Sequence, residues 1–230
     1  RWKEAVDLYR QYGKQFESNG GMNLLFLEIL VRAVEFFNSA HGLEVDAHLA
    51  WTALYVASIQ AEFNALAGKL GENRKNLTQR WALRGNLALN PDQDNIRALA
   101  LIAPQADDAA AMMAGLRATD QVNTAIQVSH NFENAPCVLF ELARCLCENS
   151  TEKAIEVLRR SLEISPDQPL TLRMLSKLEE NLGNRKEAVE SLELAINLWP
   201  NEARWHAKAA DQLSGLGNLD APVGHLQAAL

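Results

Sequence analysis

The sequence predicts an all-α fold, a right-handed superhelix (α-solenoid) of antiparallel helix pairs. Two stretches with nearly the same pattern, EKAIEVLRRSLEISPDQP and KEAVESLELAINLWPNEA, lie 34 residues apart. A fixed period of this length indicates a helix-turn-helix unit that buries its apolar face only by stacking on further copies. The chain is also rich in Ala and Leu, with 12 Gly and 7 Pro in 230 residues, and such a composition favours helix throughout.

The unit from Pro169 to Pro200 shows why the pattern is informative. It has small residues at fixed places in both helices, a glycine at the turn and a proline at the end: Ser176, Gly183, Ala188, Ala195 and Pro200. Small residues let two helix backbones approach closely, while Gly183 suits a left-handed helix end. This pattern resembles the tetratricopeptide repeat family. The resemblance implies a solenoid whose first helices line a concave groove that holds a partner protein.

The repeats are expected to be regular in the second half of the chain. The expected units span about 134–168, 169–202 and 203–230. The first is one residue short at the turn formed by Asn149 and Ser150. In the last unit we expect a turn at Gly217 and a second helix with Pro222 in its first turn, where proline is tolerated.

The first half, residues 1–133, is expected to contain degenerate repeats with extended helices. Helical patterns cover 1–16, 22–39, 46–67, 77–89, 92–102, 107–116 and 120–130. The pattern at 46–67 places Trp51, Tyr55, Ile59 and Phe63 at a spacing of four, which is typical of core side chains. Asp120 is expected in the first turn of its helix, where a carboxylate favours the helix dipole.

The two ends of the sequence indicate a fragment of a longer chain. The opening, RWKEAVDLY, resembles the second helix of a unit, and the close, GNLDAPVGHLQAAL, stops before the usual proline. We therefore expect a helix upstream of Arg1 that pairs with the first one.

Charge and composition exclude some classes of partner. The net charge of −7 and the pI near 5.3 disfavour bulk binding to nucleic acid or to an anionic membrane. The longest apolar run, Met22–Val31, contains Asn23 and Glu28 and is too short for membrane insertion. Three cysteines, at positions 137, 145 and 147, show no framework spacing, which predicts reduced thiols and a cytoplasmic setting.

The sequence contains no recognisable catalytic constellation, so the chain is expected not to be an enzyme and to use no cofactor. The five histidines are scattered, without the spacing of a metal site. Adjacent carboxylates such as Glu179 and Glu180 do not face each other on a helix, so they are not an acid/base pair. A solvated helix face is the simpler interpretation of these charges.

The resemblance implies that certain positions of each first helix face the groove. Counting these positions gives the expected partner-binding residues Phe140, Arg144, Leu170, Arg173, Lys177, Asn181 and Arg204. Four of them are basic in an acidic chain, and Arg173 and Lys177 share one helix face because they are four apart. The expected ligand is an acidic or C-terminal peptide segment of another protein, since Arg can form two hydrogen bonds to one carboxylate.

An alternative interpretation of the basic residues is ordinary pairing on the surface. Arg144, Arg173, Lys177 and Arg204 would then form weak ion pairs with Glu148, Glu179 and Glu180 on neighbouring helices. Some family members hold a C-terminal carboxylate with Lys, Asn and Arg. This chain departs from that pattern, with Phe140 and Arg144 in place of Lys and Asn.

Three functions follow from these observations. The first is a protein-interaction scaffold that binds a partner peptide or helix in the groove. The second is a substrate-recognition or regulatory arm of a larger multidomain enzyme, such as a transferase or protease. The third is a self-associating structural module, which would form a homodimer.

Overall fold

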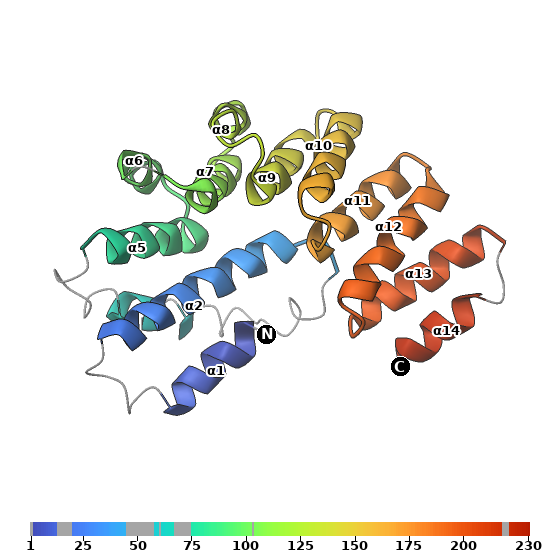
Figure 1. Ribbon diagram of the computed structural model, residues 1–230, viewed down its shortest axis with the longest axis horizontal. Helices are drawn as coiled ribbons and strands as arrows, with labels where there is room; N and C mark the ends of the chain where they lie inside the picture. Colours follow the sequence, from blue (N-terminus) through green and yellow to red (C-terminus); the bar gives the residue numbers. More distant parts are fainter. Residues whose placement is uncertain are drawn as a thin grey trace. The chain divides into compact units, whose positions relative to one another are not determined.

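The protein is mainly helical in the residues whose structure is described. A computed structural model describes residues 2–12, 20–44, 58–59, 61–66, 75–102, 104–217 and 221–230. Within these residues every regular element is an α-helix, as predicted (Figure 1). The labelled helices are α1 (Trp2–Tyr12), α2 (Gly20–Ala40), α5 (Lys75–Leu89), α6 (Gln93–Leu101), α7 (Ala106–Ala118), α8 (Val122–Ser129), α9 (Pro136–Leu146), α10 (Thr151–Ile164), α11 (Pro169–Asn181), α12 (Arg185–Leu198), α13 (Ala203–Gly215) and α14 (Ala221–Ala228). Residues 58–59 and 61–66 are also helical.

The chain divides into two compact units. Unit 1 comprises Arg1–Ser39 and Trp51–Ala125, and unit 2 comprises Ala40–Ala50 and Ile126–Leu230. The short stretch that follows Ser39 therefore belongs with the C-terminal repeats, although it is distant from them in sequence. The division into repeats with extended helices at 1–133 and regular repeats at 134–230 stays a prediction.

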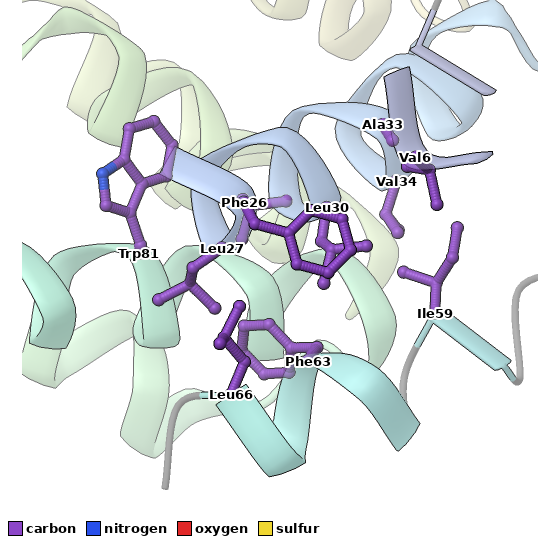
Figure 2. Close-up of a cluster of buried hydrophobic side chains, with 11 residues drawn as sticks. Val6, Phe26, Leu27, Leu30, Ala33, Val34, Ile59, Phe63, Leu66 and Trp81 are labelled. Carbon is purple, nitrogen blue, oxygen red and sulfur yellow. The ribbon is translucent and has the colours of Figure 1, made fainter. Parts of the chain in front are cut away.

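An apolar cluster holds unit 1 together (Figure 2). Side chains of α1, α2, residues 59–66 and α5 meet there, with Phe26 and Leu30 of α2 at the centre. Ile59 and Phe63 are buried in this cluster, as their spacing predicts, whereas Trp51 and Tyr55 lie outside the described residues. Gly85 of α5 allows a close approach, because a Cβ at this position would collide with the ring of Phe63.

Local polar groups set the helix ends in unit 1. Asp92 caps α6 by accepting a hydrogen bond from the Asn95 N–H at 2.8 Å, and this bond lowers the pKa of the Asp92 carboxyl. The Gln105 N–H donates to Asp108 Oδ2 at 2.8 Å, which forms half of a capping box at the start of α7.

The prediction for Asp120 was wrong. Asp120 does not lie in the first turn of a helix, because α8 begins two residues later, at Val122. Its φ of 57° is left-handed, and the Gln121 N–H donates to the Leu116 carbonyl at 2.8 Å. These are the features of a Schellman helix end, which Asp tolerates better than most residues other than glycine. Asp120 therefore ends α7 instead of starting α8.

Unit 2 contains three helix pairs in succession, α9 with α10, α11 with α12 and α13 with α14 (Figure 1). Their small and apolar repeat positions are fully buried, as the 34-residue register predicts: Ala154, Leu158, Ser161, Ala188, Leu192 and Ala195. Burial of both alanines of α12 leaves no space between this helix and its neighbours for a larger side chain.

Prolines and glycines mark the boundaries of these helices where the sequence predicts them. Pro136 and Pro169 stand at the first turns of α9 and α11, and Pro222 stands near the start of α14. Gly183 follows α11 with a φ of 80°. The Asn184 N–H donates to the Glu179 carbonyl at 2.9 Å, which completes a Schellman motif and turns the chain into α12.

Candidate functional site

The two basic residues of α11 that share one face both contact residues 42–44. Lys177 Nζ donates to the Gly42 carbonyl at 2.9 Å, and Arg173 Nη2 lies 2.7 Å from Glu44 Oε2. These partners are 135 and 129 residues away in sequence, and all four residues belong to unit 2. The side of α11 predicted to bind a peptide thus holds a segment of the same chain.

A third contact to the segment comes from α13. The Trp205 indole N–H donates to the Leu43 carbonyl at 3.0 Å. Trp205 is fully buried and stacks on Trp199, with ring centroids 5.7 Å apart, so its indole is held in place. Arg173, Lys177 and Trp205 together are named the α11–α13 face below.

The segment reaches this face by turning sharply after α2. The Leu43 N–H donates to the Ala40 carbonyl at 3.1 Å, and Gly42 has a left-handed φ of 77°. Glu44 is also left-handed, with a φ of 57°, a conformation that costs about 1–2 kcal/mol for a residue with a side chain. The turn directs two consecutive carbonyls and one carboxylate toward α11 and α13.

Arg173 lies beneath the segment and retains unused hydrogen-bonding capacity. Its side chain is 1% exposed, while that of Glu44 is 46% exposed. Arg173 Nε and Nη1 have no hydrogen-bond partner among the described residues. A guanidinium has five N–H donors and matches a carboxylate best through two parallel hydrogen bonds. The present contact with Glu44 uses one nitrogen, so a better-placed carboxylate could bind more strongly.

The glutamates of α11 are engaged elsewhere. Glu179 accepts hydrogen bonds from Arg159 at 2.9 Å and from Ser191 at 2.8 Å, and Glu180 pairs with Lys208 at 2.7 Å. The contacts of Arg173 and Lys177 with residues 42–44 thus replace the surface pairing with Glu179 and Glu180 that the alternative interpretation expects. This leaves both cations directed at the segment.

The remaining residues predicted for the groove lie at varying depths. Phe140 is buried, and the guanidinium of Arg144 lies over its ring and pairs with Glu141 of the same helix at 3.1 Å. Leu170 is half-buried, and Asn181 and Arg204 are exposed. The structure thus brings Arg173 and Lys177 together on residues 42–44, whereas within the described residues no hydrogen bond or ion pair joins Leu170 or Asn181 to that segment.

Sequence reasoning did not identify Trp205 or residues 42–44. The sequence contains one signal for Trp205. It is a large aromatic residue at the third position of the first helix of its unit, where the two preceding units have the smaller Val138 and Thr171. Gly42 follows the helical pattern at 22–39, where a glycine is typical of a helix end. Its carbonyl and that of Leu43 have no side-chain signature, so no pattern in the sequence could mark them as ligands.

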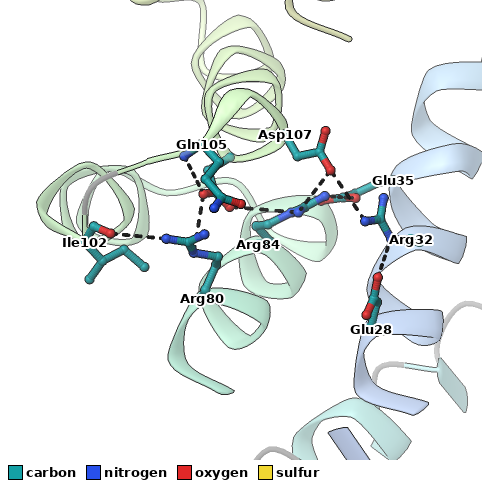
Figure 3. Close-up of polar contacts among 9 residues, drawn as sticks. Glu28, Arg32, Glu35, Arg80, Arg84, Ile102, Gln105 and Asp107 are labelled. Carbon is teal, nitrogen blue, oxygen red and sulfur yellow. Dashed lines mark hydrogen bonds and ion pairs between the residues drawn. The ribbon is translucent and has the colours of Figure 1, made fainter. Parts of the chain in front are cut away.

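A second charged cluster, in unit 1, has a structural role (Figure 3). Arg84 is 5% exposed and donates two hydrogen bonds to Glu35, at 2.8 and 2.7 Å. Its guanidinium also lies over the Trp81 ring, 4.4 Å from the centroid, and Asp107 and Asp108 approach it at 3.9 Å. Burial raises the pKa of the Glu35 carboxyl, and the hydrogen bonds from Arg84 oppose this shift. The cluster joins α2, α5 and α7.

The described parts of the chain bear on metal binding and on membrane insertion as well. No group of three or more His, Cys, Asp or Glu side chains there is placed to hold a metal ion. In the same residues no helix combines the length and the apolar character that crossing a membrane requires. The α11–α13 face therefore remains the strongest candidate for a functional site.

Comparison with protein families identifies the repeat. Residues 174–202 match the model of the Tetratricopeptide repeat family. The match lies within the unit predicted at 169–202 and includes most of α11 and all of α12. It confirms the family resemblance inferred from the sequence. No curated protein sequence matches the chain.

Solved structures similar to this chain support the same fold. Two structures of MamA AMB-1 align with TM-scores of 0.52 and 0.53, each at 18% sequence identity, and cover 67% and 69% of this chain and 96% and 91% of their own. A structure of MamA MSR-1 aligns with a TM-score of 0.50 at 19% identity and covers 67% of this chain and 94% of its own. At this identity the likeness shows the fold, which is all-α and solenoid-like.

Proposed function

We propose that this tetratricopeptide repeat protein is an interaction module that binds an acidic peptide segment of a partner protein on the α11–α13 face. One observation carries the proposal: three side chains from two successive units hold two backbone carbonyls and one carboxylate of residues 42–44. Any peptide with an acidic residue offers the same groups. The face therefore has the donors to bind both the backbone and the carboxylate of such a peptide.

Charge supports this partner. The chain carries a net charge of −7, yet Arg173 and Lys177 place two cations within one helical turn of each other. A local basic site on an acidic protein attracts anionic partners and orients them, an effect that acts more on the association rate and on specificity than on stability. Arg173 is buried, so a carboxylate that reaches it escapes most of the screening by salt.

The remaining predicted residues, Phe140, Arg144, Leu170, Asn181 and Arg204, extend the proposed binding surface along the first helices of the three units. A free C-terminal carboxylate is an alternative source of the anionic group, and Arg173 could hold either kind. The proposed role is binding and assigns no catalytic group. The cysteine spacing supports a cytoplasmic location.

The proposal predicts that Lys177→Glu abolishes binding of carboxylate-bearing peptides. An array of synthetic peptides, each with or without one acidic residue and with a free or amidated C-terminus, would be probed with the labelled chain. Lys186→Glu is the matched control, since Lys186 is exposed on α12 and makes the same change of charge. We expect wild type and Lys186→Glu to bind the acidic peptides. The signal of Lys177→Glu on the same peptides should be lower than that of wild type by at least about tenfold.

Equal retention by Lys177→Glu and Lys186→Glu would disprove the proposal, because the binding would then not use this face. The amidated and free C-termini separate the two sources of the carboxylate. Binding that requires a free C-terminus and no acidic side chain would show that the face binds the C-terminal carboxylate of the partner protein.

A further inference from the structure

The contacts at the α11–α13 face have the form of a bound ligand. Residues 42–44 contribute two backbone carbonyls and a carboxylate, and each of these groups meets a different side chain. The contacts connect residues that are 129 to 162 positions apart, so the short segment is not part of the repeats that it touches. A peptide from another protein could replace each of these groups.

The segment is also held in a way that permits its release. Glu44 is left-handed and its side chain is 46% exposed, so the carboxylate regains water readily when it leaves Arg173. Two nitrogens of the buried Arg173 have no hydrogen-bond partner among the described residues, so the guanidinium is incompletely satisfied by Glu44. Both features favour exchange for a carboxylate that approaches Arg173 with two oxygens.

Leu43 adds an apolar requirement. Its side chain is 5% exposed, and its carbonyl accepts the hydrogen bond from Trp205. A competing peptide has to provide a large apolar residue at this place and an acidic residue directly after it, because Glu44 follows Leu43. This pair of residues is more specific than acidic character alone.

We propose that residues Gly42–Glu44 are an intramolecular ligand of the α11–α13 face, and that a partner protein binds there by displacing them with an apolar–acidic residue pair. This inference rests on the proposed function and adds a form of regulation to it. A tethered ligand acts at an effective concentration of about millimolar. The apparent affinity of a partner is therefore its affinity for the open face multiplied by the fraction of molecules in which the face is open.

A labelled peptide with the sequence of residues 38–44, NSAHGLE, amidated at its C-terminus, tests the inference by fluorescence anisotropy. Glu44→Gln in the chain weakens the segment's hold on Arg173, because a neutral hydrogen bond is about half as strong as one to a carboxylate. We expect the peptide to bind the Glu44→Gln chain about tenfold more tightly than wild type. A peptide ending in Gln instead of Glu should bind both chains more weakly.

Two control chains accompany this measurement. Glu148→Gln removes the same charge at an exposed position after α9 and should bind the peptide as wild type does. Adding Lys177→Glu to Glu44→Gln should abolish binding. Circular dichroism establishes that each variant keeps the helical content of the wild type.

The outcomes separate the inference from the proposed function. Equal affinity for wild type and Glu44→Gln, with binding still dependent on Lys177, would overturn the intramolecular ligand and leave the proposed function standing. Binding that does not depend on Lys177 would overturn both. Absence of binding to the Glu44→Gln chain would also overturn the inference, because the segment would then not be a ligand of this face.

Discussion

Replacing Ala188 with Trp is expected to lower the free energy of unfolding of the protein by about 3 kcal/mol, at the upper end of the usual cost of overpacking. Ala188 is fully buried in α12, and so are Leu192 and Ala195 of the same helix. The helix packs against both α11 and α13. An indole at this position has no space unless α12 moves away from a neighbour, which would break the stacking of the repeats.

The measurement is chemical denaturation followed by circular dichroism, with Glu190→Trp as the control. Glu190 lies in the same helix and is exposed, so the same new side chain should change the stability by less than about 0.5 kcal/mol. A similar small change for both variants would contradict the repeat register and, with it, the counting that gives the predicted groove residues.

Arg84→Ala is expected to cost about 3–5 kcal/mol of stability in unit 1, the range for breaking a buried ion pair. The substitution leaves the Glu35 carboxylate with neither of its two hydrogen bonds from Arg84. It removes the cation 3.9 Å from Asp108, which is 1% exposed and still pairs with Arg80 at 3.4 Å. It also removes the guanidinium that lies over Trp81. The side chain of Glu35 is 23% exposed, which favours the lower end of the range.

Two comparisons test this interpretation by the same denaturation method. Arg97→Ala removes an ion pair in which both side chains are exposed, 75% and 96%, and should cost at most about 1 kcal/mol. The double variant Arg84→Met/Glu35→Leu should recover part of the loss, because apolar side chains of similar volume avoid the buried charge. A loss below about 1 kcal/mol for Arg84→Ala would show that the cluster does not hold the helices together.

The repeat register could be predicted because it follows from local rules. A small residue is needed wherever two helix backbones approach closely, and glycine is favoured where the chain turns left-handed. Ala188 and Gly183 are recognisable in the sequence for these reasons, and both have the environment that the pattern predicts. Asp120 shows the limit of such rules, since an acidic residue can either start a helix or end the preceding one.

The contact between residues 42–44 and the α11–α13 face could not be predicted, for two physical reasons. It joins residues more than a hundred positions apart, outside any repeat. Two of its three acceptors are backbone carbonyls, which every residue possesses. The family resemblance predicts Arg173 and Lys177 as binding residues, but only the fold shows that they already hold a carboxylate and a carbonyl of the same chain.

The indole N–H of Trp205 reports most directly on whether residues 42–44 occupy the face in solution. Its exchange with solvent can be followed by NMR, and the Trp205 signal is assigned by its loss in Trp205→Phe. Gly42→Val should release the segment, because a β-branched residue strongly disfavours the φ of 77° at this position. Gly217→Val is the control, since Gly217 has a similar φ of 79° and no recorded contact with residues 42–44.

We expect slow exchange of the Trp205 indole proton in wild type and in Gly217→Val, and exchange at least about tenfold faster in Gly42→Val, where the hydrogen bond to Leu43 is lost. The same exchange rate in wild type and Gly42→Val, with a displaced turn after α2, would contradict the intramolecular ligand.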